Sequence, residues 1–409
     1  MLDDWWQRRH TWLITLTALA IVFDGIDNQL LGIVIPNVMR EWSLPRSAFA
    51  PVISIGLIGM MIGGATAGLA GDRFGRRTAL LSSMTLFGVM TAASAMAADP
   101  MQLTILRVLA AAGLGGAIPN ATALAAEYVP PRHRPVAVTL TIVCVPLGGT
   151  IAGLLGAQLL PLVGWRSLFL IGGTVPVLYA AALTRLLPES PRDLEHRPGR
   201  WSELARSVAQ MREWRGDTLA LFGAFFSCLF AVYLAFSWLP ALLTGAGFDS
   251  ATASGGITAF NLGGIVGALA ASVVISRLGS RGPMVTMAAG ATAAAVTLGA
   301  MRIDPSQSIG PILAMITLVG GLINAVQVAM YALAAHVYPG AVRATGVVMA
   351  ASVGRVGAIL SGYAGAWAMD LGGSTSYFGV MAGAMIVTTV ALALVTRHVP
   401  RPGPSLANR

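Results

Sequence analysis

Two aspartates stand three residues apart inside an apolar run that extends over residues 12–35. These residues, Asp24 and Asp27, share one helix face with the neighbouring Asn28. A carboxylate at membrane depth costs several kcal/mol unless it is paired, hydrated or protonated. The simplest chemistry for two such groups is to take up and release a proton. The alternative is a structural one, in which both carboxylates only hydrogen-bond neighbouring helices.

The composition places these acids in a membrane. Charged residues are 11% of the 409 residues and hydrophobic residues 56%, and 48 glycines interrupt the apolar runs. Soluble domains carry roughly 25% charged residues. We therefore expect an all-α membrane protein, because runs of ~20 apolar residues are typical of spanning helices. The twelve predicted spans are 12–36, 50–70, 78–97, 101–127, 136–160, 166–187, 218–243, 252–276, 283–301, 309–336, 343–368 and 375–396.

The basic residues predict how the chain is oriented. All 26 are arginines, and most fall in loops on the side that both termini share. Positive loops stay in the cytoplasm, so we expect a multi-pass protein of the bacterial inner membrane with both termini cytoplasmic. This topology accounts for the pI of about 10.5 without a nucleic-acid partner.

The chain divides into two halves that echo one another. The sequence after the second span, residues 68–77, recurs in residues 276–281 after the eighth. The sequence after the fourth span, residues 127–134, recurs in residues 336–343 after the tenth. We expect two pseudo-symmetric six-helix bundles, residues 1–187 and 218–409, joined by a cytoplasmic linker over 188–217. Transporters built from such repeats bind substrate near mid-membrane and alternate access.

Residues 68–77 resemble the signature loop of the major facilitator superfamily, Gly-x-x-x-Asp-Arg-x-Gly-Arg-Arg. The whole chain is similar to the aromatic acid:proton symporter branch, which includes hydroxybenzoate and hydroxyphenylpropionate carriers. The matching segments are 24–27, 107–120, 188–190, 238–240 and 343–357. The chain departs from the pattern at Ser276, where the second signature loop has lost its acid, and at Ile26, where the branch has an aromatic residue.

Depth along the helices places two further charges. Asp24 lies ~18 Å and Asp27 ~22 Å along the first span, and Arg107 lies ~9 Å from the outer end of the fourth. Asp27 and Arg107 then share a depth, so we expect them to pair or compete. Arg355 lies ~18 Å into the eleventh span, level with Asp24. Static pairing of Arg107 and a structural role for Arg355 are the alternatives to substrate contact.

The resemblance and these depths give a set of candidate residues. Proton-coupling candidates are Asp24, Asp27 and Glu127. Substrate-binding candidates are Arg107, Arg355, Gln327, Tyr331, Asn324, Tyr233 and Asn28. Candidates for gating salt bridges at the cytoplasmic helix ends are Asp72, Arg73, Arg76, Arg77, Arg134, His336 and Arg343.

The predicted function is import of a small, aromatic carboxylate by proton symport. The expected protein is a monomer that needs no cofactor or metal besides the proton gradient. A proton-driven exporter of drugs or metabolites with the same fold is the main alternative. A membrane sensor would need an output domain, and an intramembrane enzyme would need a nucleophile or metal set beside the two carboxylates. Neither feature is present in the sequence.

Overall fold

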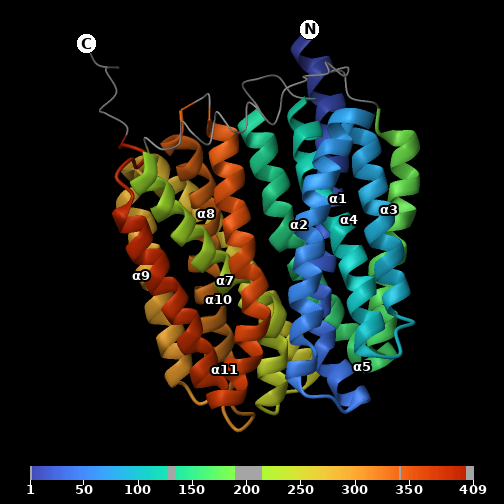
Figure 1. The fold of residues 1–409 in the computed structure, drawn as a ribbon, viewed down its shortest axis with the longest axis vertical. Helices are drawn as coiled ribbons and strands as arrows, with labels where there is room; N and C mark the ends of the chain where they lie inside the picture. The colour runs from blue at the N-terminus through green and yellow to red at the C-terminus, as the bar shows by residue number, and fades with distance from the viewer. Residues whose placement is uncertain (1, 128–133, 189–213, 340–341, 402–409) are drawn as a thin grey trace. The chain divides into compact units, whose positions relative to one another are not determined.

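The computed structural model describes residues 2–127, 134–188, 214–339 and 342–401, and every long regular element in these ranges is an α-helix (Figure 1). The helices are α1 (Leu2–Trp42), α2 (Ala50–Phe74), α3 (Arg76–Ser94), α4 (Pro100–Glu127), α5 (Arg134–Leu186), α7 (Arg215–Gly245), α8 (Ser250–Leu278), α9 (Arg281–Ala300), α10 (Ile309–Val337) and α11 (Arg343–Leu394), with a short 3₁₀ turn at Arg46–Ala48 before α2. The all-α prediction is thereby confirmed. Among the described residues, nine helices are long and apolar enough to cross a membrane; α3 is not one of them.

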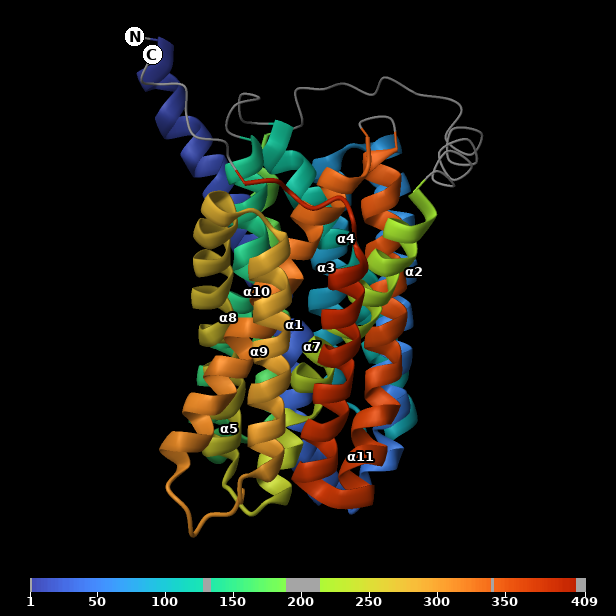
Figure 2. The same ribbon diagram turned by 90° about the vertical axis from the view of Figure 1, so that its left-hand side faces the viewer.

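Two of the helices are too long to be single spans. α5 has 53 residues and α11 has 52, so each would be roughly 80 Å long if straight, against an apolar bilayer core of about 30 Å. Non-helical backbone interrupts both, at Gly164 (φ +75°) in α5 and at Gly372–Gly373 (φ −160° and +60°) in α11. Figure 2 shows α11 as two arms that lie side by side and join at one end. Divided there, the described helices give the twelve segments that the sequence predicts.

The chain forms two compact units. Unit 1 comprises residues 1–196 together with 249–258, and unit 2 comprises residues 197–248 and 259–409. The predicted boundaries at 187 and 218 stay a prediction. Most of the predicted linker, residues 189–213, lies outside the described residues, and α7 begins at Arg215.

Close helix contacts fix the position of the two aspartates in unit 1. A Cβ added to Gly25 would lie 2.2 Å from the carbonyl oxygen of Val145, and one added to Gly148 would lie 2.2 Å from that of Val22. α1 and α5 therefore touch backbone to backbone at the turn that holds Asp24 and Asp27, as small residues allow in membranes. This contact turns the helix face of Asp27 away from α5 and toward α3 and α4.

Candidate functional site

A buried ion pair joins α1 to α4 in unit 1. Arg107 Nη2 lies 2.8 Å from Asp27 Oδ2, and Arg107 Nη1 lies 3.1 Å from Oδ1, so the guanidinium donates to both carboxylate oxygens. The Asp27 and Arg107 side chains are 0% and 5% exposed. The two residues thus pair, as their common depth predicts. Such bidentate contacts are the strongest hydrogen-bonded ion pairs that proteins form.

Two residues that the sequence reasoning missed complete this cluster. The Thr91 hydroxyl of α3 donates to Asp27 Oδ1 at 2.5 Å and is itself 3.3 Å from Arg107 Nη1. The Arg107 guanidinium carbon lies 5.6 Å from the ring centre of Phe169, on the second arm of α5. Thr91 could have been selected from the sequence, because its hydroxyl lies in the middle of an apolar span and needs a hydrogen-bond partner there. Nothing in the spacing of Phe169 distinguished it from a packing residue.

The cluster is electrically neutral as long as Asp27 is ionised. The carboxylate accepts three side-chain hydrogen bonds, two from Arg107 and one from Thr91. Removing either charge leaves the other in a medium of low polarity, which is far more costly than the intact pair. Each of the two charges therefore depends on the other for its place in the core of unit 1.

The rest of the polar turn of α1 is equally enclosed. Asp24 is 0% exposed and Asn28 is half-buried. Gln29, which the sequence reasoning did not select, is also 0% exposed and packs over Gly149 of α5, where an added Cβ would lie 2.0 Å from Gln29 Nε2. This turn of α1 therefore buries Asp24, Asp27 and Gln29 completely, a costly arrangement in a membrane-spanning segment.

A second cluster of candidates lies in unit 2, around Arg355 of α11. Tyr331 of α10 is within electrostatic range of both Arg355 and Tyr233 of α7. The Tyr331 ring meets Phe225 edge to face, with ring centres 5.1 Å apart, and Tyr233 meets Phe236 at 5.7 Å. Arg355 is half-buried, and within the described part of the chain it makes no hydrogen bond or ion pair. This half-buried guanidinium, in electrostatic range of Tyr331, thus retains its donors for an anion.

The α10 amides lie differently from each other. Asn324 is 5% exposed, donates to the Gly320 carbonyl at 2.9 Å, and packs against Gly264 of α8. It lies in the contact between α8 and α10, and its predicted place in a substrate pocket stays a prediction. Gln327 is half-buried and stands one helical turn before Tyr331.

The predicted gating arginines of unit 1 lie at helix ends. Arg73 is exposed, with its guanidinium carbon 5.2 Å from the Phe74 ring centre. Arg77 donates to the carbonyl oxygen of Thr184 on the second arm of α5. Arg76 is half-buried and packs beside Gly71. Their predicted salt bridges stay a prediction.

The corresponding candidates of unit 2 are more exposed. His336 is exposed near the end of α10, and Arg343 is exposed at the start of α11, where its Nε lies 3.3 Å from the Tyr338 carbonyl oxygen. The side chains of three further candidates lie outside the described part of the structure: Asp72, Glu127 and Arg134.

The amino-acid sequence matches a known protein family. The sequence profile of the Major Facilitator Superfamily matches residues 17–304 and 256–409. The chain is 33% identical to a gallate transporter of Pseudomonas putida over 90% of its length and 89% of the relative's. It is 36% identical to the 4-hydroxybenzoate transporter PcaK of Pseudomonas aeruginosa, covering 89% and 87%, respectively.

A solved structure shows the same fold. The crystal structure of a D-xylose-proton symporter superposes with a TM-score of 0.74, at 18% identity, over 96% of this chain and 98% of that one. The resemblance that the signature loop carried is thereby confirmed over the whole chain. This multi-pass membrane protein belongs to the major facilitator superfamily.

Proposed function

We propose that the protein is a proton-coupled symporter of the aromatic acid branch that imports a small aromatic carboxylate across the inner membrane by alternating access. Its relatives are named for gallate and 4-hydroxybenzoate, and a 31% identical relative from Escherichia coli is named for 3-(3-hydroxyphenyl)propionate. All three compounds pair a carboxylate with a hydroxylated ring. The observation that carries the proposal is Arg355, a half-buried cation beside Tyr331 that makes no ion pair in the described residues.

Arg355 is the proposed receptor for the substrate carboxylate. A guanidinium binds a carboxylate through two parallel hydrogen bonds, which fixes its orientation as well as its charge. The rings of Tyr331, Tyr233 and Phe225 would pack against the aromatic ring of the substrate, and a tyrosine hydroxyl would bond a ring hydroxyl. Gln327, one turn away on the same helix, is the proposed second polar contact.

Asp27 is the proposed proton carrier. Protonation of the Asp27 carboxylate would break its ion pair with Arg107 and leave the guanidinium without a counter-charge. An unpaired buried charge costs several kcal/mol, so the protonated state becomes favourable when an anion is bound as well. A carboxylate and a proton together carry no net charge, so their joint uptake leaves the net charge of the protein unchanged, whereas either alone changes it by one. Asp24 and Glu127 are the alternative carriers, and Asn28, one turn after Asp24 on α1, is a further proposed substrate contact.

The charged helix ends are the proposed gate. Arg73, Arg76, Arg77 and Asp72 in the first signature loop would exchange salt bridges with neighbouring helix ends during the cycle. Arg134, His336 and Arg343 would do the same at the other echoed segment. The protein would work without a cofactor, as a monomer with both termini in the cytoplasm.

Uptake into proteoliposomes tests the proposal. An inward proton gradient should drive accumulation of 4-hydroxybenzoate above its external concentration, and substrate addition without a gradient should alkalinise the medium. Arg355→Gln should abolish uptake, whereas Arg302→Gln, which changes an exposed arginine at the α9–α10 connection, should leave it intact. Gradient-driven emptying of loaded vesicles would instead support an exporter. Full uptake by Arg355→Gln would refute the assigned receptor.

A further inference from the structure

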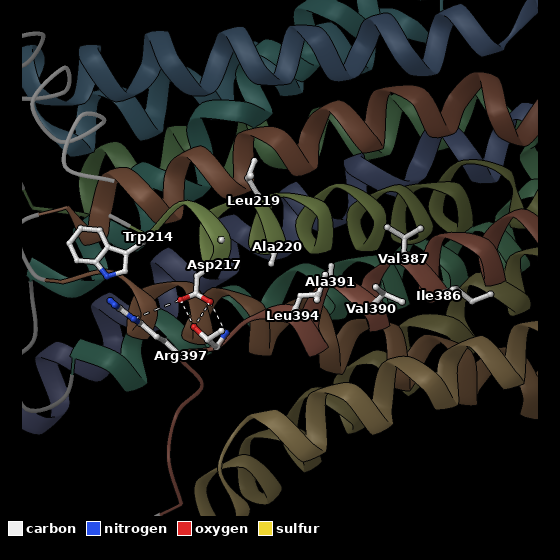
Figure 3. Close-up of a pocket in the computed structure, with 12 residues that line it drawn as sticks. Trp214, Asp217, Leu219, Ala220, Ile386, Val387, Val390, Ala391, Leu394 and Arg397 are labelled. Carbon is white, nitrogen blue, oxygen red and sulfur yellow. Dashed lines mark hydrogen bonds and ion pairs between the residues drawn. The ribbon is translucent and has the colours of Figure 1, made fainter. Parts of the chain in front are cut away.

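Two hollows share a wall at the end of unit 2 where α7 begins and α11 ends. The larger has a volume of about 750 Å³ and runs along apolar side chains of α7 and α11 (Figure 3). The smaller has a volume of about 500 Å³, and its lining includes His336, His398, Val337, Pro339 and Pro400. Trp214 and Arg397 line both hollows. An apolar hollow and a basic hollow thus adjoin at the side chains of Trp214 and Arg397.

The larger hollow has the character of a site for a hydrocarbon chain. Leu219, Val390 and Leu394, which line it, are 69%, 54% and 65% exposed. On a soluble protein such a strip would be an exposed apolar patch, but here it belongs to helices that cross the bilayer. Lipid tails are therefore the surroundings that this strip meets.

The shared wall offers two donors for an anion. Asp217 accepts from the Thr396 backbone nitrogen at 2.6 Å and from its hydroxyl at 3.0 Å, whereas Arg397 Nε is 3.8 Å away, too far for a hydrogen bond. The Arg397 side chain is 55% exposed, and its guanidinium carbon lies 5.5 Å from the Trp214 ring centre. Trp214 Nε1 is buried without an acceptor among the described residues. The indole N–H and the exposed guanidinium thus belong to neighbouring side chains of one wall.

The described lining of the smaller hollow has basic rather than acidic side chains. Its described lining includes Arg397, His336 and His398, and no aspartate or glutamate. Arg281 and Asp217 both lie within electrostatic range of His398, and Asp217 lines the larger hollow. The hollow therefore favours a negatively charged group over a zwitterionic or cationic one.

We propose that this paired hollow binds an anionic phospholipid. The phosphate would accept from Arg397 and from the Trp214 N–H, and one acyl chain would lie along Leu219, Val390 and Leu394. Basic pockets between membrane helices bind lipid head groups in this manner, and tryptophan is favoured at the same depth. A soluble anion would use the basic hollow alone and leave the adjoining apolar one without an occupant. The proposal does not depend on which substrate the protein carries.

Lipid binding to the purified full-length chain tests the proposal. Phosphatidylglycerol and phosphatidylcholine with the same acyl chains would be titrated in detergent, with bound lipid counted by native mass spectrometry and stability followed by thermal unfolding. We expect phosphatidylglycerol to bind more tightly. Arg397→Gln should weaken it about fivefold, the amount typical of one basic residue near a lipid surface. Arg302→Gln, the matched exposed arginine, should leave it unchanged.

Further variants separate the two hollows. Trp214→Phe keeps the ring and removes the N–H, so it should weaken phosphatidylglycerol binding less than Arg397→Gln does. Val390→Trp fills the apolar hollow and should weaken both lipids. If Arg397→Gln does not fold, Arg397→Lys, which keeps the charge, must retain the lipid preference, and Val390→Trp must reduce binding. Equal binding of the two lipids, or an equal stabilisation by inorganic phosphate alone, would overturn the proposal.

Discussion

The Asp27–Arg107 pair makes the sharpest prediction, because a double-mutant cycle isolates its energy. Asp27→Asn keeps an acceptor for Thr91 and leaves the Arg107 charge buried and unpaired, and Arg107→Met leaves the carboxylate in the same condition. Breaking a buried pair from one side costs about 3–5 kcal/mol of stability. The double variant removes both charges, so it should lose only ~1–2 kcal/mol, mainly the lost hydrogen bonds. The expected coupling energy is therefore at least ~3 kcal/mol.

Reversible unfolding in mixed micelles, titrated with a denaturing detergent, would measure each corner of this cycle. A matched surface pair supplies the control. Glu41 and Arg166 lie 2.6 Å apart but are 43% and 44% exposed, so Glu41→Gln with Arg166→Met should couple by no more than ~1 kcal/mol. If the Asp27–Arg107 coupling is no larger than that of the control, the reasoning about a desolvated pair is wrong. The double variant should regain stability without regaining proton-driven uptake, since the proposed carrier is absent.

Three further predictions follow from local geometry. Thr91→Val removes one hydrogen bond to the carboxylate of the buried pair, and it should lower stability by about 1–2 kcal/mol in the same unfolding titration, with no loss if that bond is absent. Gly25→Ala would press a methyl group against the α5 backbone and should lower the yield of folded protein, whereas Gly56→Ala, with open space around it, should not; equal yields would contradict the close contact. Burial, with the nearby positive charge of Arg281, holds the pKa of His398 below 6.5, so the folded state prefers its neutral form and stability should fall as pH drops below about 6.5. His398→Gln should flatten that part of the thermal-unfolding profile, and an unchanged profile would show that the residue does not titrate there.

The sequence predicted what depends on position along a helix. Twelve apolar segments follow from hydropathy alone, and the common depth of Asp27 and Arg107 follows from a rise of 1.5 Å per residue. Neither prediction requires knowing which helices pack against one another. The resemblance of residues 68–77 to a known signature supplied the fold that the family comparison confirmed.

The sequence could not predict how each helix is rotated about its axis. Asn324 shares a face with Gln327 and Tyr331 by spacing, yet the missing side chain of Gly264 lets it pack into α8. Thr91 joins the ion pair because the backbone contact at Gly25 sets the rotation of α1. Trp214 and Arg397 are far apart in sequence and meet only because α7 packs along α11.

The chain reversals inside α5 and α11 have a mechanical consequence. Each takes one or two glycines, at Gly164 and at Gly372–Gly373, and Gly75 alone joins α2 to α3, whereas α9 and α10 are joined by the longer segment 301–308. Because the two arms of each helix are joined by so short a connection, a change in the tilt of one arm must also change the tilt of the other. We expect each such hairpin to travel as a single lever during the transport cycle, with spin labels on its two arms keeping a constant separation.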